Sequence, residues 1–234
     1  MRFILILSLT LMGLSGADKD YLLGKFDPAT DPRFTKLRPE YTAGAANGGY
    51  LRTETYAAFI EMSDKAKMEG VNLVIISATR NFNSQKQIWE NKWNGKVEVE
   101  GIKLTTVADP KERARMILRY SSMPGSSRHH WGTDMDLNDL NNSYFDSGEG
   151  FKTYQWLTAH AAEYGFCQPY TTKASGRTGY EEEKWHWSYV PLSIPFLRDY
   201  VNIIHNKDIT GFKGSETARS IRIIEEYVQG VSCR

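Results

Sequence analysis

Apolar residues recur every three or four positions in several segments, a spacing typical of amphipathic helices. The clearest stripe is Phe59, Met62 and Ala66, and Gly70 is expected to end that helix. Four further segments show a helical pattern: 83–93, 154–164, 197–204 and 221–228. An Asp-Pro pair at 109–110 predicts the start of another helix, which runs towards residue 120.

Three segments are predicted to be strands. The nearly continuous apolar run at 71–79 is typical of a buried strand, and 185–190 is a second one. After Gly132 the order Thr-Asp-Met-Asp-Leu alternates, so a strand there would place Asp134 and Asp136 on one face. Strands mixed irregularly with helices indicate an α+β fold rather than a doubly wound sheet. No Gly-rich phosphate loop follows 71–79, which argues against a nucleotide enzyme.

The N-terminus has the pattern of a secretory signal peptide. Arg2 supplies the positive charge, residues 3–14 the apolar run and Ser15-Gly16-Ala17 the cleavage site. About a dozen apolar residues are too few to cross a bilayer, so no membrane span is expected after cleavage. We predict a signal peptide at 1–17, a surface arm rich in Asp, Pro and Gly at 18–48, and a single domain at 49–234. The protein would be periplasmic, extracellular or associated with the cell wall.

Charge and cysteine content narrow the picture further. The chain has 29 basic and 28 acidic residues, and loss of Arg2 with the signal peptide makes the two numbers equal. This balance gives no indication of a nucleic-acid partner. Export permits a disulfide between Cys167 and Cys233, while two buried free thiols are the alternative. We take the disulfide as the prediction.

The candidate chemistry lies in the stretch SSRHHWGTDMDL at 126–137. A carboxylate buried beside histidines is costly unless a cation neutralises it, and zinc accepts both imidazole and carboxylate ligands. A surface turn rich in His and Asp is the alternative for this stretch alone. A third candidate ligand is His186, which on a strand would point away from Trp185 and Trp187 into a pocket that these tryptophans do not line. Glu183 would then lie near the metal as a general base.

These residues resemble the VanY-type zinc D-alanyl-D-alanine carboxypeptidases, a group of the LAS-type peptidases. Ser127, His129, Gly132 and Asp136 match the pattern SxHxxGxxxD, and Glu183 with His186 matches ExxH. Other matches to the family lie upstream and between these motifs: Ser77, Arg80, Gln85, Trp156-Leu157, Ala162 and Tyr164-Gly165-Phe166. The resemblance runs from about residue 80 to residue 190 in the order of the family.

The resemblance implies a Hedgehog-like fold, in which a small antiparallel sheet carries a zinc site and helices flank the sheet. It implies one Zn²⁺ per chain and an exported enzyme that removes the C-terminal D-alanine from peptidoglycan stem peptides, with DD- or LD-specificity. Zinc-bound water would be the nucleophile. The implied roles are zinc ligands for His129, Asp136 and His186, general base for Glu183, and substrate binding for Arg80, Gln85, Ser127 and Tyr170.

Two positions depart from or vary within the family pattern. Asp134 stands where the family usually has Ala. It would alter the substrate pocket, compete as a metal ligand, or contact a metal ligand from behind. His130 occupies a variable position and is predicted at the pocket edge or on the surface. A peptidoglycan endopeptidase of the same family is the near alternative. A non-catalytic cell-wall or zinc-binding module is the alternative of another class, against which Glu183 argues, because a zinc binder needs no base.

Overall fold

The computed structural model describes residues 18–233, so the predicted signal peptide at 1–17 lies outside the described residues. The fold is α+β, as predicted, and contains two antiparallel sheets. The smaller sheet pairs β1 (Phe34–Lys36) with β2 (Tyr50–Arg52). The larger sheet has the strand order β3 (Ile75–Ser77), β4 (Asp134–Leu137), β6 (His186–Tyr189) and β5 (Phe166–Cys167).

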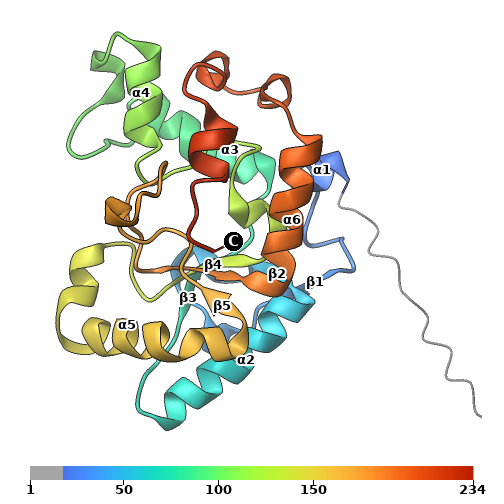
Figure 1. Ribbon diagram of the computed structural model, residues 1–234, viewed down its shortest axis with the longest axis vertical. Coiled ribbons are helices and arrows are strands. Elements are labelled where there is room, and N and C mark those ends of the chain that lie inside the picture. Colours follow the sequence, from blue (N-terminus) through green and yellow to red (C-terminus); the bar gives the residue numbers. More distant parts are fainter. Residues whose placement is uncertain (1–17, 234) are drawn as a thin grey trace, which may run out of the picture.

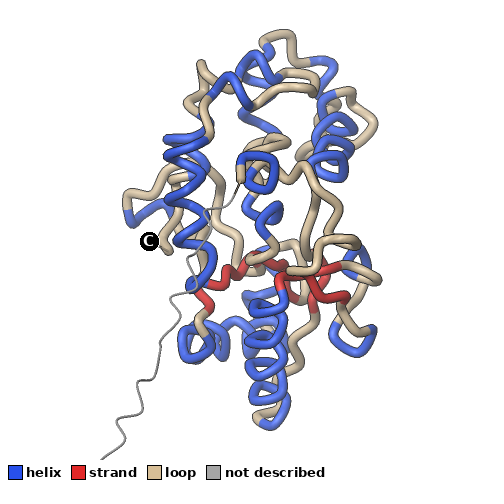
Figure 2. The backbone as a smooth tube through the Cα atoms, turned by 90° about the vertical axis from the view of Figure 1, so that its right-hand side faces the viewer, coloured by secondary structure: helices blue, strands red, loops and turns tan. Residues whose placement is uncertain are grey.

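Helices cover both faces of the larger sheet. Their bounds are α1 (Lys19–Leu22), α2 (Thr53–Met68), α3 (Phe82–Trp93), α4 (Pro110–Ile117), α5 (Gly148–His160) and α6 (Val190–Ile203). Helices α2 and α5 lie on one side of the sheet, whereas α3, α4 and α6 lie on the other side (Figure 1). The side view shows the strands as a layer between these two groups (Figure 2). None of the helices in this described part combines the length and the hydropathy needed to cross a bilayer.

Strand alternation separates an apolar face of the sheet from a polar one. Met135 and Leu137 of β4 and Trp187 of β6 belong to a buried cluster with residues of α2 and α5. Successive strand residues point to opposite faces, so Asp136 and His186 are directed to the other side. The apolar face therefore fixes the register that brings the polar side chains together.

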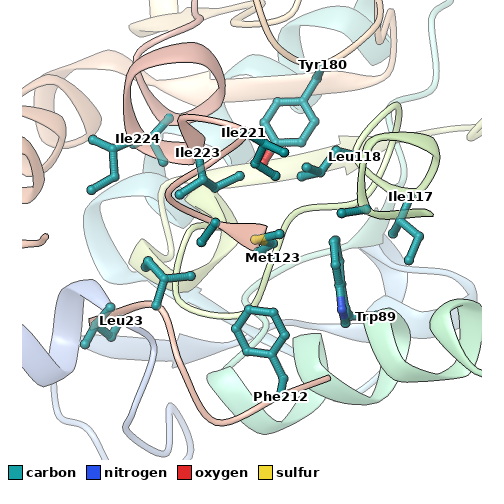
Figure 3. Packing of buried hydrophobic residues seen from close by; sticks show 14 of the residues in the cluster. Leu23, Trp89, Ile117, Leu118, Met123, Tyr180, Phe212, Ile221, Ile223 and Ile224 are labelled. Carbon is teal, nitrogen blue, oxygen red and sulfur yellow. The ribbon is translucent and has the colours of Figure 1, made fainter. Parts of the chain in front are cut away.

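A second hydrophobic cluster lies on the opposite side of the sheet, among α1, α3, α4 and the C-terminal segment. Figure 3 shows Trp89 of α3 close to Phe212 and Met123, and the centroids of the Trp89 and Phe212 rings are 5.8 Å apart in an edge-to-face arrangement. This cluster holds α3 in place, and α3 forms one wall of the candidate site.

Most predicted helices are present, but two predicted elements differ from the structure. The strand predicted at 71–79 is limited to Ile75–Ser77, because only this part pairs with β4. The helix predicted at 221–228 is only a short π-helical segment at Ile223–Val228. It follows Arg222, whose left-handed backbone conformation (φ 55°) is incompatible with a continuous helix.

The segment 18–48, predicted as a surface arm, is anchored in the core by its first part. Tyr21 and Leu22 are almost fully buried. The Tyr21 hydroxyl donates to the Trp131 carbonyl (2.6 Å), and the Trp131 indole donates to the Leu22 carbonyl (3.2 Å). Trp131 thus belongs to the core and is not exposed. The predicted disulfide between Cys167 and Cys233 is present and joins β5 to the C-terminal segment.

Candidate active site

The register of β4 against β6 builds the centre of the site. Asp136 lies directly opposite His186, and Asp134 lies opposite Ser188. His129 comes from the short 3-10 turn Arg128–Trp131 that precedes β4. Gly132 ends this turn with a φ of 72°, and a Cβ at this position would lie 2.4 Å from the Phe34 ring. Glycine is therefore required for the chain to pass from the turn into the strand.

His129, Asp136 and His186 converge in the structure, and their ligand atoms all lie within 4.8 Å of one another. Asp136 Oδ1 is 3.4 Å from His129 Nε2 and 3.2 Å from His186 Nδ1. Atoms bound tetrahedrally to zinc at about 2.0–2.1 Å lie about 3.3–3.4 Å from one another, so these separations suit that ion. All three side chains are buried. Among residues 18–233, His129 Nε2 and Asp136 Oδ1 are buried polar atoms without a hydrogen-bond partner.

The second nitrogen of each histidine ring fixes which nitrogen faces the centre. His129 Nδ1 donates to the Ala78 carbonyl (2.9 Å), which leaves Nε2 as a lone-pair donor to a metal. His186 Nε2 donates to Asp134 Oδ1 (3.0 Å), which leaves Nδ1 for the same role. Asp134 therefore orients a candidate ligand, which is one of the alternatives predicted for this residue. Another alternative, direct competition as a ligand, is disfavoured because its oxygens are occupied.

Asp134 is part of a buried charge network. Its Oδ1 also accepts from Arg128 Nε (2.8 Å), and its Oδ2 accepts from the Thr133 hydroxyl (2.5 Å). Arg128 Nη2 donates to the Ser188 hydroxyl (2.6 Å), whereas Nη1 has no partner in the described chain. Burial would raise the pKa of Asp134, but the Arg128 guanidinium and His186 outweigh it and hold this pKa below its usual range. Asp134 is thus a permanent anion behind His186.

Electrostatics in the centre favour a cation. Burial lowers the pKa of His129, as expected for a neutral ligand. Burial also acts to lower the pKa of His186, but hydrogen bonds to Asp134, Asp136 and Glu183 outweigh it and raise this pKa well above its usual value. The same carboxylates that retain a proton on His186 would stabilise a divalent metal in its place.

Glu183 lies beside the three candidate ligands. Its Oε2 is 3.3 Å from His186 Nδ1, and its side chain is buried. The loop before β6 positions it: the Glu183 backbone N–H donates to the Tyr170 carbonyl (2.9 Å), and the Gln168 amide donates to the Glu183 carbonyl (3.1 Å). Burial raises the pKa of Glu183, which brings this carboxylate closer to the range of a general base at neutral pH.

A cavity of about 470 Å³ opens onto this centre and is lined by all the residues predicted to bind substrate. Three of them present buried polar atoms that lack a partner within the described chain: Arg80 Nε, Gln85 Oε1 and Ser127 Oγ. Arg80 is anchored on its other edge, where Nη1 donates to the Ser77 hydroxyl (2.9 Å). The Gln85 amide nitrogen is likewise held by the Ser122 carbonyl (2.8 Å). These side chains are fixed on one side and open on the other.

Two aromatic residues complete the wall. Tyr170 packs edge-on against His186 with ring centroids 4.8 Å apart, and burial raises the pKa of its hydroxyl well above its usual value. Trp185 also lines the cavity, contrary to the prediction that both tryptophans flanking His186 would face away from it. Strand β6 begins at His186, so the alternation on which that prediction relied does not extend back to Trp185. Trp187 lies within β6, follows the alternation and packs in the apolar cluster.

His130 was predicted at the pocket edge or on the surface, and this prediction is wrong. Its side chain is fully buried and both ring nitrogens are bonded. Nδ1 donates to the Arg80 carbonyl (2.6 Å), and Nε2 accepts from the Gly125 N–H (3.0 Å). Burial lowers the pKa of His130 to about 3, so the ring is neutral. His130 connects the Arg80 backbone to the loop before Ser127 and so positions two residues of the cavity.

Sequence reasoning missed two cations of the site. Arg128, which neutralises Asp134, gives no periodic signal, because six residues and a turn separate the two. Lys92 lines the cavity as well, and its spacing from Gln85 in the sequence could have predicted this position. It follows Gln85 by seven residues on α3 and therefore lies on the same helical face.

A family model described as VanY, D-alanyl-D-alanine carboxypeptidase, matches residues 48–192, more than half of the chain. The chain belongs to this family. The match to the VanY family includes every residue of the candidate site, from Arg80 to His186.

Two curated relatives are similar to the same part of the chain. YodJ of Bacillus subtilis (strain 168) is 30% identical over 164 residues, which cover 69% of this chain and 52% of YodJ. A D-alanyl-D-alanine carboxypeptidase of Enterococcus faecalis (strain ATCC 700802 / V583) is 28% identical over 132 residues, which cover 56% of this chain and 45% of the relative. The chain thus spans about half the length of these curated relatives.

Solved structures show the same fold. The LdcB LD-carboxypeptidase aligns with a TM-score of 0.52 at 21% identity and covers 89% of this chain and 81% of its own. A vancomycin resistance D,D-pentapeptidase VanY in complex with Zn(II) aligns with a TM-score of 0.50 at 20% identity, over 75% of this chain and 94% of its own.

Proposed function

We propose that this protein is an exported, zinc-dependent carboxypeptidase that removes the C-terminal D-alanine from peptidoglycan stem peptides. The observation that carries the proposal is the convergence of His129 Nε2, Asp136 Oδ1 and His186 Nδ1 beside the Glu183 carboxylate, at the floor of a polar cavity. Membership of the VanY family and the Zn(II) in a solved VanY of the same fold support it. Export rests on the N-terminal sequence pattern.

Zinc held by these three residues would supply a Lewis acid that polarises the scissile carbonyl and favours a hydroxide-like nucleophile at neutral pH. Glu183 accepts a proton from the attacking water while the new C–O bond forms. It then returns that proton to the amide nitrogen as the C–N bond breaks. The products are the shortened peptide, with a new carboxyl terminus, and free D-alanine. Burial raises the pKa of Glu183, which favours this proton transfer.

The substrate-binding wall accounts for recognition of a chain end. Arg80 Nε and Ser127 Oγ are donors without a partner in the described chain, and a carboxylate offers several acceptor sites. Gln85 Oε1 is an acceptor in the same condition, suited to a peptide N–H. Because Arg80 and Gln85 are each held on one edge, they meet the substrate with little loss of conformational freedom.

The test compares a peptide ending in D-Ala-D-Ala as the free acid and as the terminal amide, with purified zinc-loaded protein. Mass spectrometry should show release of one D-alanine from the acid. We expect amidation to lower kcat/KM by at least about 100-fold, because it removes the anion that the partly buried Arg80 guanidinium would bind. Arg80→Lys should also be costly, because an ammonium cannot reproduce the planar fork.

The same experiment separates the alternatives. Equal cleavage of acid and amide, or cleavage inside the stem, would indicate an endopeptidase. Zinc binding without any hydrolysis would indicate a non-catalytic zinc-binding module. A protein without bound zinc after loading, measured by atomic emission, would contradict the metal centre, as would full zinc occupancy in His186→Ala and Asp136→Ala.

A further inference from the structure

Lys92 is a cation in the cavity wall that the proposed mechanism does not use. Gln85, Ile88 and Lys92 all line the cavity and share one face of α3. The Lys92 ammonium donates to the Ser121 hydroxyl (2.6 Å), and no carboxylate of residues 18–233 forms an ion pair with it. A largely buried ammonium with a neutral partner is costly, because a single hydroxyl replaces little of its hydration.

The other charged residues of the cavity leave Lys92 without an anionic partner in the described chain. The two carboxylates in its lining, Asp136 and Glu183, belong to the proposed metal centre and its base. Arg128 is neutralised by Asp134. Arg80 Nη1 lies 3.7 Å from Asp136 Oδ2, but Arg80 Nε has no partner in the described chain. Arg80 Nε and the Lys92 ammonium can therefore both bind an anionic ligand. The cavity is thus suited to a substrate that carries a negative charge.

The electrostatic neighbours of Lys92 locate it within the site. Burial lowers the pKa of Lys92, repulsion from Arg80 lowers it further, and attraction to Glu183 raises it. Lys92 therefore lies close enough to Arg80 and Glu183, which line the same cavity, to interact with both. An anion bound between Arg80 and Lys92 would relieve their repulsion.

We propose that Lys92 is a specificity-determining residue that binds, together with Arg80, the terminal carboxylate of the residue to be released. This inference rests on the proposed carboxypeptidase function and extends its clamp from one cation to two. The terminal carboxylate is the anion nearest to a scissile bond, since a single Cα separates it from the leaving nitrogen. Carboxylates of earlier stem residues lie on the other side of that bond.

The experiment compares zinc-loaded wild-type and Lys92→Met proteins on two substrates, one with a free terminal carboxylate and one with a terminal amide. For the free acid we expect Lys92→Met to lower kcat/KM by about 10- to 100-fold, chiefly through KM, the range for one charge-assisted hydrogen bond. For the terminal amide the same change should matter less than about 2-fold. Lys92→Arg should restore most of the activity towards the acid.

Two controls separate binding from structure. Ser121→Ala keeps the cation but removes its hydroxyl partner, so it should retain the preference for acid over amide. Lys96→Met removes an exposed positive charge four residues further on and should leave both activities unchanged. Equal losses for acid and amide in Lys92→Met would mean that Lys92 is structural and would overturn the proposal. A loss that depends instead on a carboxylate in the third residue of the stem would also overturn it.

A binding measurement keeps this inference separate from the proposed function. Zinc-loaded Glu183→Gln and the double variant Glu183→Gln/Lys92→Met are titrated calorimetrically with the acid and with the amide. If the wild-type protein releases no D-alanine, the proposed function fails, and these titrations still decide the role of Lys92. A preference for the acid that decreases at least about 10-fold in the double variant supports the proposal, and an unchanged preference or no binding of the acid refutes it.

Discussion

Replacement of Asp134 by Asn tests the buried network behind the proposed metal centre. Asp134 is fully buried and accepts hydrogen bonds from Arg128, His186 and Thr133. Asn has almost the same volume, but it carries no charge and one of its two polar atoms is a donor. The change therefore leaves the Arg128 guanidinium, whose side chain is 1% exposed, without its anion.

The magnitude follows from the burial of this pair. Removal of one partner of a buried ion pair costs about 3–5 kcal/mol, whereas an exposed pair contributes about 0–1 kcal/mol. We expect the metal-free Asp134→Asn protein to lose about 3 kcal/mol or more, a shift of about 1 M or more in the urea midpoint. Zinc affinity should fall about 10- to 100-fold, because His186 loses the acceptor that holds its ring in the binding orientation.

The assay measures urea unfolding in EDTA and zinc affinity at neutral pH by competition with a chelator. The matched control is Asp146→Asn, the same substitution in the exposed pair with Lys184, where the Asp146 side chain is 62% exposed. We expect this control to change stability by less than about 1 kcal/mol and to leave zinc affinity unchanged. An Asp134→Asn protein with the urea midpoint and zinc affinity of the wild type would refute the reasoning.

Three further predictions concern the base, the metal and the disulfide. Glu183→Gln should keep one zinc per chain but lose turnover by about 10²- to 10⁴-fold, and retained turnover would remove its role as base. Zinc binding at pH 7.5 should release about one proton, because the raised pKa of His186 keeps its ring protonated in metal-free protein. Calorimetry in two buffers of different ionisation enthalpy measures the number of protons released. A binding heat that does not depend on the buffer would contradict this prediction. The cysteines of the Cys167–Cys233 bridge are 66 residues apart in sequence, so Cys167→Ser should lower the free energy of unfolding in urea by about 4 kcal/mol. Two titratable thiols in the denatured, unreduced wild-type protein would contradict the bridge.

The local pattern of apolar residues predicted many helices and strands, because these elements depend on residues that are neighbours in sequence. The stripe of Phe59, Met62 and Ala66 predicts α2, and these three residues are buried in the structure as expected. The alternation after Gly132 predicts a strand with Asp134 and Asp136 on one face, which β4 provides. Both follow from backbone periodicity, which a sequence displays directly.

The contribution of segments outside the motifs was less predictable. Residues 18–48 have the composition of a surface arm, yet Tyr21 is buried against Trp131, 110 residues away. A short apolar sequence, such as that of α1, gives no sign of the groove that receives it. The C-terminal segment likewise has a helical stripe, but Arg222 interrupts it. Such outcomes depend on shape complementarity between distant parts of the chain.

The sequence by itself therefore determined the α+β class, the candidate ligands His129, Asp136 and His186, and the proposed base Glu183, because these depend on short spacings and on the family motif. Only the tertiary structure decided that Asp134 is the buried partner of Arg128 and His186, and that Lys92 faces the same cavity as Arg80. The physical reason is that burial and hydrogen-bond geometry set the state of a polar side chain. Both arise from contacts between segments that lie far apart in sequence.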